Sequence, residues 1–191
     1  MADDDFRVFN TYYGIYVSDW EETYPGFANH HMFLVDEYIN EGCSCITSSR
    51  ASDTNEFLYP HYIKETYFIE GIIKGHVSFA CSGCTGYITD YSVTIGKVNE
   101  GDTPMKTELF TTGWVTLNHT LGWDGTYPSI TENILGERVY PFWIPAWDKK
   151  ILTKEDRIFL KIETDSNNCV VLWHSNDSTW EDVKIEIPYK M

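Results

Sequence analysis

Two long apolar segments, residues 65–79 and 87–98, constrain the fold of this chain more than any other feature. They flank a short turn that holds two cysteines and two glycines and suits a change of chain direction. Both segments are rich in β-branched and aromatic residues, which pack well on the pleated surface of a sheet. Because apolar residues crowd both faces of each segment, we expect them to be the central pair of strands in a β-sandwich.

Further strand-like segments follow at short intervals, with turn residues between them. They are residues 107–118, 138–144, 157–164, 168–174 and 183–188. A polar sequence at 153–156 predicts one helical or 3₁₀ turn before a strand. Repeated strands without an amphipathic helix of ordinary length predict an all-β fold, an antiparallel two-sheet β-sandwich. Long strands and long connections favour a jelly roll over an immunoglobulin-like topology.

The first 60 residues are less regular than the rest of the chain. They begin with an acidic tip and continue through short strand-like pieces to a loop rich in Ser, Thr, Asp and Asn at 42–55. We therefore predict an irregular N-terminal arm or extension at 1–60 and a β-sandwich domain at 61–191.

The net charge of −15 limits the partners of the chain. An acidic surface without a Lys/Arg cluster repels phosphate backbones and anionic lipids, so we expect neither direct nucleic-acid binding nor membrane binding. The N-terminus, Met-Ala-Asp-Asp-Asp-Phe, has no basic and apolar signal-peptide pattern, and no apolar run has membrane-spanning length. The sequence therefore predicts synthesis and folding in the cytoplasm.

Four cysteines form two close pairs that are candidate metal ligands: Cys43, Cys45, Cys81 and Cys84. Zinc prefers four thiolate or imidazole ligands in a tetrahedron, and two pairs brought together would supply them. The Cys-x-Cys spacing of the first pair is unusual for such a site. We therefore expect reduced thiols and no cofactor, with zinc, or a disulfide outside the cell, as alternatives.

The sequence lacks the local motifs of common enzymes. There is no His-Glu-x-x-His run, no Gly-x-Ser-x-Gly elbow and no phosphate-binding glycine loop. The six histidines are scattered, and acidic pairs are too common for one to be singled out as a catalytic dyad. We therefore predict that the chain is not an enzyme.

Residues 140–147, Tyr-Pro-Phe-Trp-Ile-Pro-Ala-Trp, place two prolines among aromatic rings. Proline donates no ladder hydrogen bond, so this composition suits an edge strand. Together with Trp114, the rings would form an aromatic surface that stacks on sugars or anchors a protein interface, unless they cap the core. The candidate interface or sugar-stacking residues are Trp143, Trp147, Trp123, Tyr127 and Tyr140.

Segment 151–163, a short apolar-then-polar lead into a strand that begins with a charged pair, carries a family resemblance together with segment 88–95. They resemble the jelly-roll and β-sandwich modules of structural proteins of tailed viruses, such as auxiliary capsid (decoration) proteins. The resemblance implies a non-enzymatic virion protein, made in the host cytoplasm, that stabilises a capsid as a homo-oligomer bound to other virion proteins such as the major capsid protein. The alternative is a carbohydrate-binding β-sandwich module that uses exposed aromatic residues.

Overall fold

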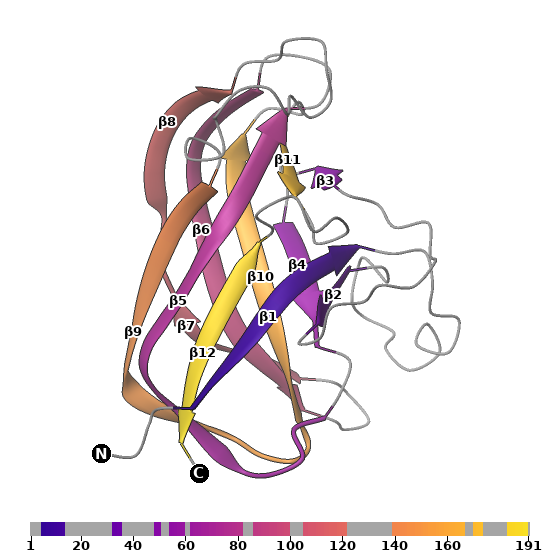
Figure 1. Ribbon diagram of the computed structural model, residues 1–191, viewed down its shortest axis with the longest axis vertical. Helices are drawn as coiled ribbons and strands as arrows, with labels where there is room; N and C mark the ends of the chain where they lie inside the picture. The colour runs from indigo at the N-terminus through magenta and orange to yellow at the C-terminus, as the bar shows by residue number, and fades with distance from the viewer. Residues whose placement is uncertain are drawn as a thin grey trace.

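The computed structural model describes the chain as an all-β protein. Two antiparallel sheets pack face to face, and no helix occurs in the residues described (Figure 1). This confirms the predicted two-sheet β-sandwich, whereas the jelly-roll topology is not confirmed. The structure describes residues 5–13, 32–35, 48–50, 54–59, 62–81, 86–99, 105–121, 139–166, 170–173 and 183–190.

The front sheet in Figure 1 is built around β5. Its strands, from the free edge inward, are β9 (Val139–Leu152), β5 (Tyr67–Cys81), β12 (Lys184–Lys190) and β1 (Asp5–Tyr13). Beyond the end of β12, the edge of β5 continues into β11 (Val170–Trp173), which pairs with β3 (Ser48–Arg50). Both edges of β5 are therefore occupied.

The back sheet is built around β6 and β10. Its strands are β4 (Thr54–Leu58), β10 (Asp156–Ser166), β6 (Gly86–Asn99), and then β7 (Met105–Thr111) and β8 (Val115–Leu121) along one edge of β6. The short strand β2 (Met32–Val35) connects the sheets, since it pairs antiparallel with β1 and, through Phe33 and Leu58, parallel with β4.

The two segments that we expected to be the central pair are central strands of opposite sheets. β5 pairs with β9, β12 and β11, whereas β6 pairs with β10, β7 and β8. Their inward faces meet in the core, where Phe79 of β5 lies 6.0 Å from Tyr91 of β6 between ring centroids. The apolar content of both segments thus reflects burial between the layers.

The core consists of side chains at alternate positions of each strand, as expected for packed sheets. From the four longest contributors they are Ile69, Ile73 and Val77; Tyr91, Val93 and Ile95; Phe142, Ile144 and Ala146; and Ile158, Leu160 and Ile162. Phe142 lies over Gly75, where an added Cβ would come within 2.4 Å of the ring and of the Lys184 carbonyl oxygen. Glycine at this position therefore lets the ring enter the core.

Two local features differ from the sequence expectations, and a third, the single turn before β10, agrees with them. The predicted strand 107–118 is divided into β7 and β8 at Gly113, whose φ of +66° interrupts a regular strand. The predicted strand 138–144 continues through Pro145 to Leu152. Residues 153–156 form a tight turn, in which the Asp156 amide donates to the Thr153 carbonyl at 2.9 Å.

The strands described within the first 60 residues are hydrogen-bonded into the sandwich, because β1 pairs with β12 and β4 pairs with β10. The division into an arm and a domain stays a prediction. None of the described residues forms a helix long and apolar enough to cross a membrane.

Candidate functional site

Among the strands that the structure describes, β9 pairs with β5 alone and forms a free edge of the front sheet, where it presents two tryptophans to solvent. Along it, Phe142, Ile144 and Ala146 are buried, whereas Trp143 is 62% exposed and Trp147 is 70% exposed. Successive side chains of a strand point to opposite faces, so the same alternation that fills the core places both tryptophans outside.

The positions of the two prolines in the ladder explain why β9 tolerates them. Pro141 lies opposite His76 and Pro145 lies opposite Ile72, so the prolines share one parity in the ladder with β5. The residues that alternate with the prolines direct their backbone N–H and C=O groups toward β5. The backbone groups of the prolines point toward the free edge. Two N–H donors are therefore missing from that edge, which disfavours pairing with a further strand.

The free edge of the back sheet lies on the same side of the sandwich. β7 and β9 lie close to each other, and β8 and β9 lie on the same side in Figure 1. Trp114, between β7 and β8, is 60% exposed, and Met105 at the start of β7 is 62% exposed. These two residues, Trp143 and Trp147 are the most exposed large apolar side chains in the described part of the chain. We call Trp114, Trp143 and Trp147 the aromatic edge.

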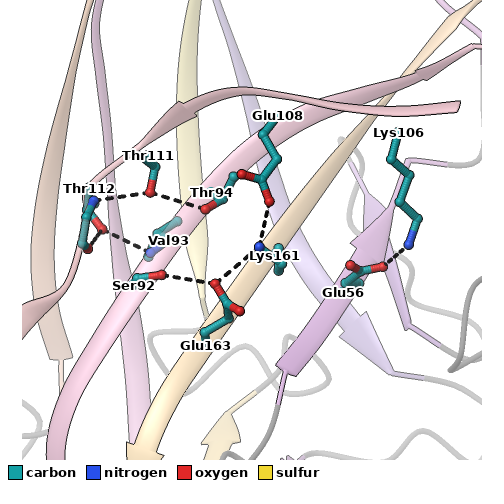
Figure 2. A network of polar contacts seen from close by, with 11 residues as sticks. Glu56, Ser92, Val93, Thr94, Lys106, Glu108, Thr111, Thr112, Lys161 and Glu163 are labelled. Carbon is teal, nitrogen blue, oxygen red and sulfur yellow. Dashed lines mark hydrogen bonds and ion pairs between the residues drawn. The ribbon is translucent and has the colours of Figure 1, made fainter.

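Hydrogen bonds fix the turn that presents Trp114. The Thr112 amide donates to the Val93 carbonyl at 2.9 Å, and the Val93 amide donates to the Thr112 hydroxyl at 3.0 Å. The Gly113 amide donates to the Thr111 hydroxyl, which also lies 3.2 Å from the Thr94 hydroxyl (Figure 2). The turn is therefore anchored to β6 by side chains as well as by backbone.

Few charges lie within the aromatic edge, although 23% of the chain is charged. Segments 109–121 and 139–147 contain no Asp, Glu, Lys or Arg. Next to them, Lys74 lies opposite Trp143 across the ladder, and the Lys149 ammonium lies 3.6 Å from the Phe68 ring centroid. The surface is thus apolar at its centre and has charged residues of both signs around it, since Asp148 follows Trp147 and Glu186 lies opposite Lys74.

The structure separates the sequence-predicted aromatic residues. Trp143 and Trp147 share the outer face of β9, whereas Tyr140 turns inward, with ring centroids 5.7 Å from Phe79 and 6.4 Å from Tyr91. Trp123 and Tyr127 lie outside the described residues. Sequence analysis included Trp114 but offered no reason for its exposure, which comes from the turn at Gly113.

Of the candidate zinc ligands, Cys43, Cys45 and Cys84 lie outside the described residues. Cys81 ends β5, where its backbone is paired with Val170. In the part of the chain that the structure describes, no three His, Cys, Asp or Glu side chains are grouped to hold a metal ion. Zinc binding stays a prediction.

The outer face of the back sheet carries a polar network that sequence analysis missed (Figure 2). The Lys161 ammonium lies 2.6 Å from the Glu108 carboxylate and 3.2 Å from that of Glu163, to which the Ser92 hydroxyl donates at 3.4 Å. Burial lowers the pKa of Lys161, but hydrogen bonds to Glu108 and Glu163 outweigh it and raise this pKa overall. A second ion pair joins Lys106 to Glu56. Cross-strand spacing of Lys and Glu was the available signal.

The network stabilises the sheet rather than forming an exposed binding site. Ser92 and Thr94 are 4% and 3% exposed, and the Lys161 side chain is 16% exposed. The accessible, chemically distinctive surface is therefore the aromatic edge.

Comparison with known proteins gives the sandwich a context. No protein-family model matches the chain, and no curated protein is significantly similar to it in sequence. Two crystal structures of a CocE/NonD family hydrolase from Staphylococcus aureus match 100% and 96% of this chain, with TM-scores of 0.55 and 0.54 and identities of 10% and 9%. An aminopeptidase from a marine sediment Thaumarchaeota archaeon matches 73% of this chain, with a TM-score of 0.49 and 14% identity.

The matches cover only part of each hydrolase. They include 37% and 36% of the Staphylococcus aureus chain and 26% of the archaeal chain. This chain thus spans little more than a third of the length of the CocE/NonD family hydrolase, and the likeness at this identity is one of fold.

These neighbours correct the functional prediction. The two Staphylococcus aureus structures are of a hydrolase and not of a capsid protein, so the prediction of a virion decoration protein is wrong. The carbohydrate-binding alternative belonged to the same functional prediction and is not retained. Alternating strands specify a sandwich but not its role, since one fold hosts many functions.

Proposed function

We propose that the chain is a non-catalytic β-sandwich module of a hydrolytic enzyme. The observation that supports this most is the match of the whole chain to 37% of a CocE/NonD family hydrolase. The remainder of that hydrolase has no counterpart in this chain. Because a shared fold does not carry an activity, the proposal gives this chain a place beside a catalytic unit and leaves the reaction to that unit.

The surface of the sandwich favours a binding role. Aromatic residues with few charges around them are typical of the centres of protein interfaces, and the aromatic edge has this composition.

On the back sheet, the Lys161 ammonium holds the carboxylates of Glu108 and Glu163 in ion pairs. Such pairs suit a stable scaffold that positions a neighbouring domain.

The proposal is tested by assaying the purified chain with p-nitrophenyl esters and aminoacyl p-nitroanilides. The assembly or longer polypeptide that contains the chain in its native source is assayed in parallel. We expect hydrolysis by the native assembly and none above the buffer rate by the chain alone. Hydrolysis by the isolated chain would make it the catalyst, and an inactive native assembly would remove the link to hydrolases.

A further inference from the structure

We infer that the outer face of β5 and β9 is a docking surface for an amphipathic α-helix of a partner protein, whose apolar stripe is flanked by acidic residues. The inference rests on the proposed function for the kind of protein that carries this helix, which is a hydrolytic unit. The shape, edge chemistry and charge of the described strands carry the argument.

The centre of this surface is apolar and exposed. Trp143 and Trp147 are 62% and 70% exposed, with the exposed Pro145 between them on the same face of β9. Across the ladder, Ile72 lies opposite Pro145 and is 38% exposed. A contiguous apolar group of this kind on a charged protein marks an interaction site.

The spacing of the two tryptophans fits a helix. Trp147 lies four residues along the strand from Trp143, which places their Cα atoms about 13 Å apart. An α-helix with its side chains is about 10–12 Å across, so it fits between the two rings over Pro145 and Ile72. Beyond Trp147 the pairing with β5 shifts register between Ile69 and Gly71. A bulge bends the strand there and ends the flat surface.

The edge of β9 argues against a strand as the docked element. Pro141 and Pro145 remove N–H donors from the free side of the strand, so a regular ladder cannot continue there. A partner must therefore contact the face of the sheet and its rings. A helix satisfies its own backbone hydrogen bonds and needs none from the edge.

The charged residues around the apolar centre are net positive. β5, β9 and β12 together contain five lysines, of which Lys150, Lys184 and Lys190 are ion-paired with Asp148, Glu186 and Glu70. The other two lysines give these strands a formal charge of +2 in a chain of −15. They are Lys149 and the exposed Lys74, which lies opposite Trp143 in one ladder and opposite Glu186 in the other. Acidic residues on both sides of an apolar stripe would complement these lysines.

The same charges disfavour a second copy of this chain as the occupant. An isologous contact places each surface against itself, which would bring the lysines of one copy near those of the other. Two chains of charge −15 also repel one another at long range. A different protein, with acidic flanks on its helix, fits better.

The test places the photo-crosslinker p-benzoylphenylalanine at position 72 of the full chain in its native source. Crosslinked residues are mapped by mass spectrometry, and the same crosslinker at the exposed position 87 is the control. We expect position 72 to crosslink to one helix with an apolar stripe flanked by Asp or Glu. Trp143→Ser should lower the yield about tenfold, as for a central interface tryptophan. Lys74→Glu should lower it more than Lys154→Glu, which changes an exposed turn lysine by the same charge.

Several results would overturn the inference. In the crosslinking experiment, these are crosslinks to a second copy, to a strand, to a basic surface or to no protein. In a separate measurement, binding to vesicles of anionic phospholipid that is lost on substitution of Trp143 would also overturn it. If the mapped helix belongs to a protein without hydrolytic activity, the docking surface stands and the proposed function fails. If the assembly has hydrolytic activity but its crosslinks avoid this surface, the proposed function stands and the docking surface fails.

Discussion

Neighbouring residues in β9 have opposite roles because of strand alternation. Phe142 is 3% exposed and Trp143 is 62% exposed. The inward ring depends on Gly75, which leaves space where a Cβ would clash with both the ring and the Lys184 carbonyl. A residue without a side chain in β5 therefore helps to determine which aromatic ring of β9 reaches solvent.

Burial of Tyr91 predicts a pH dependence of stability. Burial raises the pKa of this phenol above 10.0, so the folded state holds the proton more tightly than the unfolded state. Its stabilising contribution is present below pH 10 and is lost as the pH rises through the folded pKa, by at most about 1.4 kcal/mol per pH unit. Urea unfolding of Tyr91→Phe should show a smaller loss of stability above pH 10 than the wild type. The same loss of unfolding free energy above pH 10 in both proteins would contradict this.

At the scale of elements, β9 is an edge strand whose prolines limit pairing. Replacing Pro141 and Pro145 with valine restores two N–H donors to the free edge. Because an edge with both donors and acceptors templates another strand, we expect more self-association than in the wild type. Light scattering after size-exclusion chromatography over a range of concentrations measures it. A double variant that is folded and no more associated than the wild type would show that the prolines do not protect this edge.

The back sheet depends on a partly buried cross-strand network. Lys161→Met leaves Glu108 and Glu163 close together without the ammonium between them, so we expect a loss of about 1 kcal/mol in the free energy of unfolding. The control is Lys150→Met, which removes an ion pair with the 85% exposed Asp148 and should cost less than about 0.5 kcal/mol. Urea denaturation compares the two variants. Equal losses would mean that the network adds nothing beyond a surface pair.

At the scale of the whole molecule, sequence pattern predicted the layers better than their connections. Alternation in the segments that became β6 and β10 was sufficient for an antiparallel sandwich. The placement of β5 and β6 in opposite sheets depends on partners far along the chain, such as β9 and β10. Local patterns do not specify such pairings, and for the same reason they led to a capsid prediction for a chain whose fold is shared with part of a hydrolase.

The candidate site was predictable where it depends on local chemistry. Prolines alternating with aromatic residues indicated an edge strand and identified Trp143 and Trp147. The orientation of Tyr140 depends on its packing against Phe79 and Tyr91, which belong to distant strands. The exposure of Trp114 depends on a turn anchored to Val93. Neither feature follows from the neighbouring sequence.

We propose above all that this chain serves a hydrolytic unit through the tryptophans of its aromatic edge. The most direct test is the hydrolytic activity recovered with tagged chain from the native source, normalised to the amount of folded chain. We predict that the wild type and the Tyr87→Ser control recover equal activity, and that the Trp143→Ser/Trp147→Ser variant recovers about tenfold less or lower still. Equal recovery by the double variant, or no activity with the wild type, would contradict the claim.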